Sequence, residues 1–161
     1  MVMQPAVPAY PGVVLRALAP ADEAAWAALF ARYARFYATQ PSASALRTTW
    51  EWLMAPGGPL TGVVAADADG LLGLAHYRSV PESLQGRRSC FLDDLFVDPH
   101  HRRRGVGEAL LREVARRAQQ SGLWPLQWAT ARDNLQARRL YDRLARATDW
   151  VIYAQDAPEA P

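Results

Sequence analysis

The spacing of apolar residues predicts one strand followed by two helices in the first third of the chain. Apolar and β-branched residues from Val13 to Leu18 are typical of a short strand. Pro20 suits the first position of a helix, and large apolar residues then recur at helical spacing. These residues are Trp26, Leu29, Phe30, Tyr33 and Tyr37. A second helix is expected over residues 45–54, because a Pro-Gly-Gly-Pro sequence follows it.

The middle third of the chain predicts three strands. Residues 61–66 and 71–80 flank an Asp-Ala-Asp-Gly sequence, which is typical of a hairpin turn. We expect a polar loop from Pro81 to Arg88 and a further strand from Ser89 to Val97.

The last third alternates helices with strands. Residues 105–120 form a strongly amphipathic pattern, and Gly122 is placed to end that helix. A strand over 125–131, a helix over 134–147 and a last strand over 150–154 are expected to follow. The whole order indicates an α/β fold (α+β in its mixed sheet) with helices on the sheet faces and a parallel crossover between residues 89 and 131.

Length and composition support one globular domain. The 161 residues are 50% hydrophobic and 21% charged. We expect a core over about residues 12–155 with flexible ends at 1–11 and 156–161. No apolar run is long enough to span a membrane, and no secretory signal pattern opens the chain. The single cysteine, Cys90, excludes an internal disulfide, so a cytoplasmic location is expected.

The charged residues and the possible metal ligands give little information about the class of function. All 18 basic residues are Arg, and 16 acidic residues are interspersed with them, giving a net charge of +2. This balance is too mild to indicate a nucleic-acid partner. His76 lies within a strand pattern, where a hydrogen-bonded structural role is expected, and His100 and His101 lack metal-ligand spacing, so no metal is expected.

The turn between the strand ending at Val97 and the helix from Gly105 is the first candidate binding site. Gly105 and Gly107 allow a tight turn and a close approach of the backbone to a ligand. The first amides of the helix point outward and favour an anion such as a pyrophosphate. The loop alone fits equally well with glycines that only serve the turn and arginines that only face solvent.

The neighbourhood of this turn resembles the GNAT superfamily of N-acetyltransferases. The strand from Leu92 to Val97 is followed by Asp-Pro and then by Arg102-x-x-Gly105-x-Gly107, which is similar to the acyl-CoA loop of that family. A second matching stretch runs from Trp128 through Asn134-x-x-Ala-x-x-Leu-Tyr141. The resemblance extends from about Cys90 to Tyr141 and implies a GNAT-like fold, with a central mixed β-sheet flanked by helices.

The resemblance implies direct transfer of an acetyl group from acetyl-CoA to a primary amine in a ternary complex. The absence of an appended recognition domain favours a small-molecule amine, although a protein N-terminus or lysine fits the same chemistry. Main-chain groups of Leu95, Phe96 and Val97 would bind the pantetheine arm, and Asn134 would contact the cofactor. The pyrophosphate would be held by Arg102, Arg103, Arg104, Gly105, Val106, Gly107 and Glu108.

Tyr141 is the candidate acid for the departing thiolate. It lies seven residues after Asn134, so both fall on one stripe of a helix. A phenol stays protonated at neutral pH, which suits this role. Without the family resemblance, a core aromatic beside Leu140 and Leu144 is the better interpretation of the tyrosine.

Asp93 and Asp94 are the candidate bases, because an amine must lose a proton before it attacks. Strand alternation places the two side chains on opposite faces, unless a β-bulge intervenes. The resemblance favours Asp93, since related sequences often carry Glu at that position. Ion pairing of this carboxylate with an Arg is an equally good interpretation.

Two other functional classes remain open from the sequence. One is a nucleic-acid-binding module that uses the loop arginines and a ridge at positions 138, 139, 143 and 146. The other is an acyl-CoA sensor without catalysis.

The chain also lacks the glycine that many family members carry soon after the tyrosine, so the acceptor site is expected to differ. The resemblance allows a homodimer, and the sequence fixes no oligomeric state.

Overall fold

The computed structural model describes residues 11–155, so the ends expected at 1–10 and 156–161 lie outside the described residues. The chain divides into two compact units, residues 1–129 and 130–161, which are described in turn. The expectation of a single domain stays a prediction.

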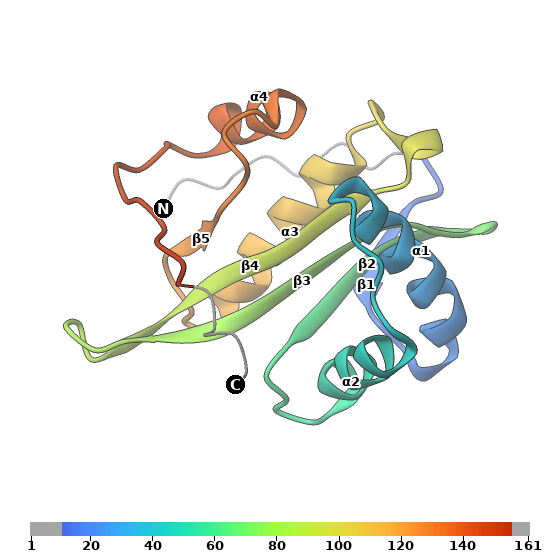
Figure 1. The fold of residues 1–161 in the computed structure, drawn as a ribbon, viewed down its shortest axis with the longest axis horizontal. Coiled ribbons are helices and arrows are strands. Elements are labelled where there is room, and N and C mark those ends of the chain that lie inside the picture. Colours follow the sequence, from blue (N-terminus) through green and yellow to red (C-terminus); the bar gives the residue numbers. More distant parts are fainter. Residues whose placement is uncertain (1–10, 156–161) are drawn as a thin grey trace, which may run out of the picture. The chain divides into compact units, whose positions relative to one another are not determined.

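A five-stranded sheet forms the first unit, with the strands in chain order (Figure 1). The first four strands are antiparallel neighbours, and the fifth is parallel to the fourth. The strands are β1 (Val14–Ala17), β2 (Thr61–Asp67), β3 (Gly70–Glu82), β4 (Arg87–Val97) and β5 (Leu126–Trp128). The expected mixed sheet and its parallel crossover are therefore confirmed.

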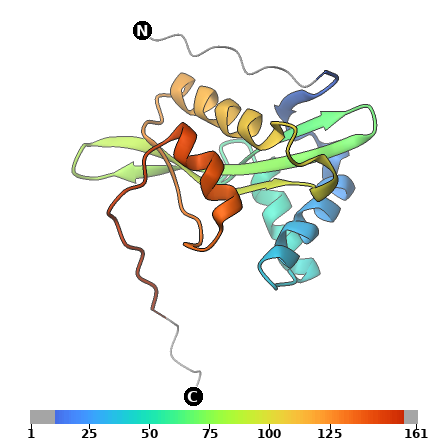
Figure 2. The ribbon, with the colours of Figure 1, turned by 90° about the horizontal axis from the view of Figure 1, so that it is seen from above.

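Helices cover both faces of this sheet, as Figure 2 shows. On one face lie α1 (Glu23–Phe36) and α2 (Ala43–Met54), and on the other lies α3 (Val106–Gln120). The amphipathic pattern of α3 is confirmed, because its buried residues recur at helical spacing. They are Val106, Leu110, Leu111, Val114 and Ala118.

The core beneath α1 and α2 is rich in aromatic side chains. Trp26 and Leu29 from α1 and Trp50 from α2 pack on Val64, Leu74 and Phe96 of the sheet. The indoles of Trp26 and Trp50 lie 5.1 Å apart, centroid to centroid. This packing fixes α1 over the middle of β3 and β4, where the candidate site lies.

A short ion-paired turn sets the start of α1. The 3-10 helix η1 (Pro20–Asp22) precedes it, and Asp22 accepts hydrogen bonds from both terminal nitrogens of Arg16 at 2.6 and 2.8 Å. Asp22 also accepts from the Ala19 amide at 2.8 Å. Hydrogen bonding from Arg16 holds the pKa of Asp22 below its ordinary value, so the carboxylate stays ionised at neutral pH.

The structure corrects the expected loop from Pro81 to Arg88. Pro81 pairs with Arg88 and Glu82 with Arg87, so β3 and β4 continue through most of that stretch. An ion pair of 2.8 Å between Arg87 and Glu82 closes the end of the hairpin. Polar residues on an exposed hairpin lack the apolar alternation by which a strand is recognised.

The helix α2 begins two residues earlier than expected, because the Ser42 hydroxyl caps it by accepting from the Ala45 amide.

The second unit contains one helix, α4 (Leu135–Leu144), within its described residues. Asn134 is its N-cap, and its side-chain oxygen accepts from the Ala137 amide at 3.3 Å. The helix ends at Leu144, three residues earlier than expected, and the chain leaves it through an extended Ala145.

The last strand expected over 150–154 is wrong. These residues form no strand in the structure, and the four from Trp150 to Tyr153 are 65–90% exposed. Their alternation and β-branched content are typical of a strand, but a strand forms only where a neighbouring strand offers backbone partners. Composition alone does not show whether such a partner exists.

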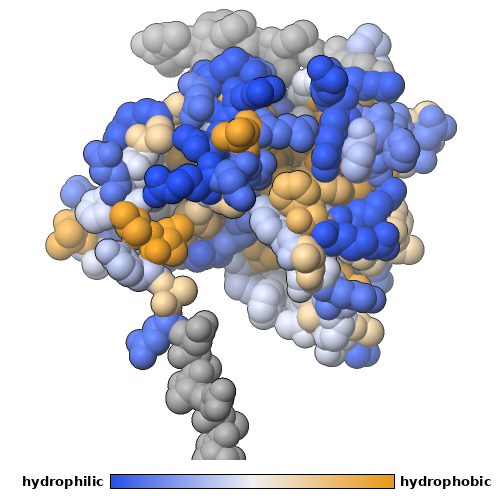
Figure 3. All heavy atoms as spheres, turned by 45° about the horizontal axis from the view of Figure 1, so that its top comes forward, coloured by the Kyte–Doolittle hydropathy of each residue, from blue (hydrophilic) through white to orange (hydrophobic). Residues whose placement is uncertain are grey.

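Hydrophilic side chains cover most of the face drawn in Figure 3, with apolar side chains in separate small patches. None of the helices in residues 11–155 is long and apolar enough to cross a membrane.

Candidate active site

A β-bulge in β4 brings two neighbouring carboxylates to the same face of the sheet. His76 of β3 pairs with Asp94, whereas Tyr77 pairs with Leu92, so Asp93 is the extra residue in β4. The side chain of Asp94 contacts His76, and that of Asp93 contacts Arg78, which lies two positions further along β3. Residues two apart on a strand share a face. Opposite faces were expected for the two carboxylates unless a β-bulge intervened, and the structure contains that bulge, which places both on one face.

Asp94 lies in a network of hydrogen bonds beneath α1. Its Oδ2 is 2.9 Å from Nδ1 of His76, whose Nε2 accepts from the indole N–H of Trp26 at 2.9 Å. His76 is fully buried, whereas 21% of the Asp94 side chain is exposed. The structure therefore confirms that His76 lies in a strand and is hydrogen-bonded. His76 thus holds one oxygen of the carboxylate, and the side chain keeps a partly exposed surface.

Tyr33 of α1 adds a phenol to the surroundings of Asp94. Burial raises the pKa of Tyr33 far above its ordinary value, and the nearby charges and hydrogen bonding of Asp94 and Tyr37 act in the same direction. The phenol is therefore neutral at any physiological pH. Its ring packs against Phe96 with centroids 5.5 Å apart and meets the half-exposed Tyr37 edge-on at 5.2 Å.

Asp93 is occupied by an ion pair. The Nε of Arg78 donates to both oxygens of Asp93 at 3.0 Å, and its guanidinium lies 5.2 Å from the ring centre of Phe91. Both of these bonds come from Nε, which is one of the three guanidinium nitrogens. The arginine is partly exposed and lies on the same face of the sheet as Asp94.

Beyond the bulge, the outer edge of β4 is not covered by β5. The parallel pairing joins only Cys90, Phe91 and Leu92 to Leu126–Trp128, so the two strands separate after Leu92. Because the amide of Asp98 donates to the Leu72 carbonyl, the ladder alternation directs the main-chain groups of Leu95 and Val97 toward this edge.

The alternation treats the three main-chain candidates differently. Phe96 lies opposite Leu74 in the ladder, and its main-chain groups face β3. The Val97 carbonyl already accepts from Nε of Arg102 at 3.0 Å. Both main-chain groups of Leu95 and the amide of Val97 are thus the groups that this edge presents.

The loop between β4 and α3 is a tight turn with open space beside it. Gly105 is the N-cap of α3 with φ +79°, and Arg103 also adopts a positive φ of +61°. A Cβ added at Gly105 would have no atom within 4 Å, so there is room next to the loop. The first intrahelical bond joins the Ala109 amide to the Gly105 carbonyl, and the amides of Val106 and Gly107 precede it. These features are those of an anion site at a helix N-terminus.

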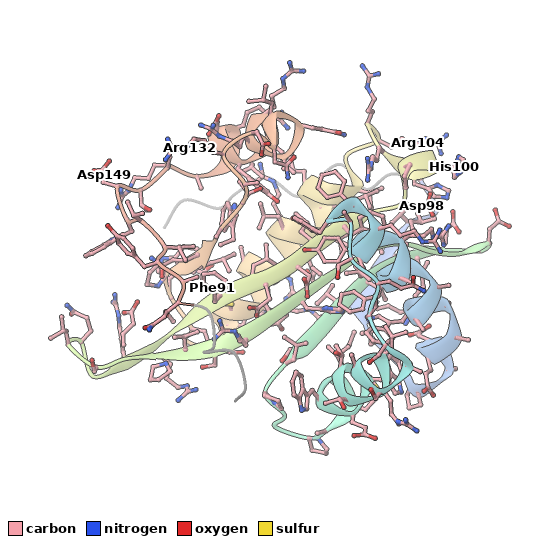
Figure 4. All side chains as sticks on the ribbon, viewed as in Figure 1. Phe91, Asp98, His100, Arg104, Arg132 and Asp149 are labelled. Atoms are coloured by element: carbon pink, nitrogen blue, oxygen red, sulfur yellow. The ribbon has the colours of Figure 1, made fainter. Side chains whose placement is uncertain are left out.

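Asp98 anchors this loop from below. Its side chain is 6% exposed, accepts from the His100 amide at 3.0 Å and pairs with Arg32 of α1 at 2.7 Å. Figure 4 shows Asp98, His100 and Arg104 at the same turn. The guanidinium of Arg102 lies 5.6 Å from the ring centre of Phe96. The loop and α1 are therefore linked by an ion pair between a buried carboxylate and a partly exposed guanidinium.

In the second unit, Asn134 and Tyr141 lie on α4 at the expected spacing. Asn134 Nδ2 donates to the Thr130 hydroxyl at 3.1 Å, while its oxygen caps the helix, so its side chain shapes the loop before α4. Tyr141 lies near the end of the same helix. Their roles toward a cofactor stay predictions.

Comparison with known proteins decides the family. The model of the acetyltransferase (GNAT) family matches residues 25–145. The chain belongs to the GNAT family. It is 32% identical over 146 residues to the D-amino-acid N-acetyltransferase HPA3 of Saccharomyces cerevisiae, covering 89% of this chain and 91% of that protein.

A second sequence relative supports the membership, and a solved structure shows the same fold. An uncharacterised N-acetyltransferase of Bacillus subtilis, YhfO, is 30% identical over 148 residues, which are 89% of this chain and 97% of that protein. The crystal structure of ribosomal-protein-alanine N-acetyltransferase from Brucella melitensis biovar Abortus 2308 superposes with a TM-score of 0.76 at 24% identity. That match covers 90% of this chain and 99% of the other, and it shows the shared fold.

Membership makes the protein an acetyltransferase, and acetyl-CoA is the co-substrate of its family. Among residues 11–155, no group of three or more His, Cys, Asp or Glu side chains is placed to hold a metal ion.

Several residues that surround the two carboxylates were not predicted from the sequence to belong to the site. Trp26 and Tyr33 were expected mainly as helix core, and Arg78 and Arg32 carried no signal at all. Their partners lie at sequence separations of 50, for Trp26 and His76, and of 15, for Arg78 and Asp93. The one local signal was Asp98 before Pro99, which is typical of a side-chain cap at a turn.

Proposed function

We propose that the protein transfers the acetyl group of acetyl-CoA directly to the primary amine of a small molecule, and that α-amino acids are its preferred acceptors. The observation that carries the proposal is that Asp94 and Arg78 lie on one face of the sheet, beside the part of β4 with which β5 does not pair. The yeast relative at 32% identity acetylates D-amino acids according to its name. D-amino acids are therefore the first acceptors to test.

The residues of the first unit fit acetyl-CoA. The open space beside Gly105 and the leading amides of α3 suit the pyrophosphate, with Arg102, Arg103, Arg104, Val106, Gly107 and Glu108 completing the loop. The main-chain groups of Leu95 and the Val97 amide suit the polar pantetheine arm. When bound, acetyl-CoA supplies the acetyl group as a thioester and leaves as CoA.

Asp94 is the proposed base, in place of Asp93. The Asp94 carboxylate is hydrogen-bonded by His76 and Tyr33 yet stays partly exposed, so it can take a proton from the acceptor ammonium at its exposed surface, directly or through water. Asp93 is committed to the ion pair with Arg78, which was the alternative interpretation for this carboxylate. A main-chain amide on the outer edge of β4, such as that of Leu95, would stabilise negative charge on the carbonyl oxygen.

Tyr141 is the proposed acid that protonates the departing thiolate, and Asn134 is the proposed cofactor contact on the same helix. Both roles follow from family membership and from the matched motif. The only cysteine supports direct transfer rather than an acetylated enzyme. Cys90 is only 1% exposed. This burial, with the charge of Asp93, raises the pKa of its thiol to about 11, so the thiol is protonated at neutral pH.

Arg78 is expected to bind the carboxylate of an amino-acid acceptor. Positions 76 and 78 of β3 are about 7 Å apart along the strand, which leaves room for an α-amino acid with its amine toward Asp94 and its carboxylate toward Arg78. Arg78→Gln should therefore raise KM for α-amino acids about tenfold or more, because a hydrogen-bonded charge pair is lost. KM for the matched amines without a carboxylate should stay the same.

The measurement is steady-state kinetics with both enantiomers of several amino acids, their decarboxylated amines and a short peptide. Arg87→Gln is the control, since Arg87 pairs with Glu82 at the hairpin end. Equal KM changes for amino acids and amines would contradict the role of Arg78. Faster turnover of the peptide than of any free amino acid would contradict the proposed substrate class.

A further inference from the structure

The deepest part of the site is a chain of two hydrogen bonds that spans three elements. Trp26 of α1 donates to His76 of β3, and His76 contacts Asp94 of β4; both distances are 2.9 Å. Trp26 is 1% exposed and His76 is fully buried. The chain ends at the one member with an exposed surface, the Asp94 carboxylate.

The donor chemistry of this chain admits one arrangement of protons on a neutral imidazole. The indole N–H of Trp26 is a donor only, so Nε2 of His76 must be the acceptor and carries no hydrogen. The hydrogen of a neutral His76 is then on Nδ1, and it is donated to Oδ2 of Asp94. The opposite tautomer would place two donors against each other at Trp26 and two acceptors against each other at Asp94.

We infer that His76 is a positioning residue for Asp94 and that Trp26 fixes the tautomer through which it acts. This inference rests on the proposed function, in which Asp94 takes a proton from the acceptor amine. The Nδ1–H bond holds Oδ2 and so restricts the orientation of the carboxylate. Asp94 needs such a constraint because it follows a bulge, where the ladder fixes the side-chain direction less tightly.

A catalytic purpose explains the burial of this polar chain better than stability does. Replacing both partners of a buried hydrogen bond by apolar groups of similar shape is often nearly neutral for stability. Trp26, His76 and Phe30 already pack as a ring cluster, with Phe30 and His76 centroids 5.2 Å apart. An apolar ring at position 76 would pack there too, but it would not orient a carboxylate.

Three variants separate positioning from packing. His76→Leu removes the donor to Asp94 and should lower kcat about tenfold to a hundredfold, because misplacing a catalytic group by about 1 Å can cost about 10²-fold, with KM for acetyl-CoA unchanged. His76→Asn keeps an N–H donor near the place of Nδ1 and should recover part of that loss. Trp26→Phe removes the indole N–H together with part of a buried ring, so it should also lower stability. Because the donor from His76 to Asp94 stays in place, kcat should fall less than in His76→Leu.

The decisive spectroscopic measurement is the ¹⁵N-edited NMR spectrum of the histidine rings, which reports the tautomer without turnover. We expect His76 of the wild type to carry its hydrogen on Nδ1, and Trp26→Phe to give a mixture of tautomers. His100 and His101, in the loop before α3, are the internal references. Because His76→Leu removes a buried polar residue and risks misfolding, Trp26→Phe and His76→Asn carry the test if it does not fold.

The outcomes separate this inference from the proposed function. Hydrogen on Nε2 of His76 would overturn the inference even if the enzyme is active. Wild-type kcat in His76→Leu, combined with a large loss in Asp94→Asn, would also overturn it and leave Asp94 as the base. No transfer to any acceptor by the wild type would refute the proposed function and the positioning role together. Nδ1–H in the wild type, with partial recovery in His76→Asn, would support the inference.

Discussion

Asp94→Asn is expected to lower kcat by about 10²- to 10⁴-fold, the usual contribution of a positioned acid or base. The amide has nearly the shape of the carboxylate but cannot take a proton from the acceptor ammonium. Its amide oxygen can still accept from Nδ1 of His76, so the fold should be kept. Steady-state kinetics at saturating acetyl-CoA measures the effect.

Asp93→Asn is the matched control for Asp94→Asn, because the two carboxylates are neighbours on the same face of the sheet. It weakens the ion pair with Arg78, so KM for amino acids should change while kcat stays close to the wild-type value. The reverse result, a large loss in Asp93→Asn and a small one in Asp94→Asn, would restore Asp93 as the base.

Tyr141→Phe is expected to lower kcat by a similar factor while cofactor binding persists. The substitution removes only the phenolic hydroxyl, which is the proposed proton donor to the thiolate. Acetyl-CoA at a hundredfold excess over its dissociation constant should still stabilise the folded variant by about 2.7 kcal/mol, as measured by thermal unfolding.

The control for the tyrosine is Tyr153→Phe, the same change at a side chain that is 90% exposed. It should leave kcat and the stabilisation by acetyl-CoA unchanged. Normal turnover in Tyr141→Phe would remove the tyrosine from the chemistry. Loss of the acetyl-CoA stabilisation in that variant would show that the tyrosine serves binding.

The elements with a strong local pattern were predictable from the sequence. The spacing of buried residues in α3 and the Asp-x-Asp-Gly turn between β2 and β3 are set by neighbours a few positions away. In that turn, Asp67 accepts from the amides of Asp69 and Gly70, as its composition indicated. The tight turn before α3 was likewise predictable, because its arginines and glycines lie next to one another in the sequence.

The features that depend on distant partners were not predictable in the same way. Strand alternation gave opposite faces for Asp93 and Asp94, since the bulge is a property of the pairing with β3 and not of β4 alone. The ion pair of Asp93 with Arg78, which favours Asp94 as the base, likewise depends on a residue 15 positions away in the sequence. The residues from Trp150 to Tyr153 carry a strand pattern, yet no strand forms there, because pairing needs a partner that the pattern does not reveal.

The central claim is tested most directly by analysing the products of one reaction. The wild-type protein is incubated with acetyl-CoA and a D-amino acid, and mass spectrometry measures the N-acetyl product while a thiol reagent measures free CoA. We predict equal amounts of the two products, both absent when the amino acid is omitted. Release of CoA without N-acetyl product, or no release with any amine offered, would contradict the account.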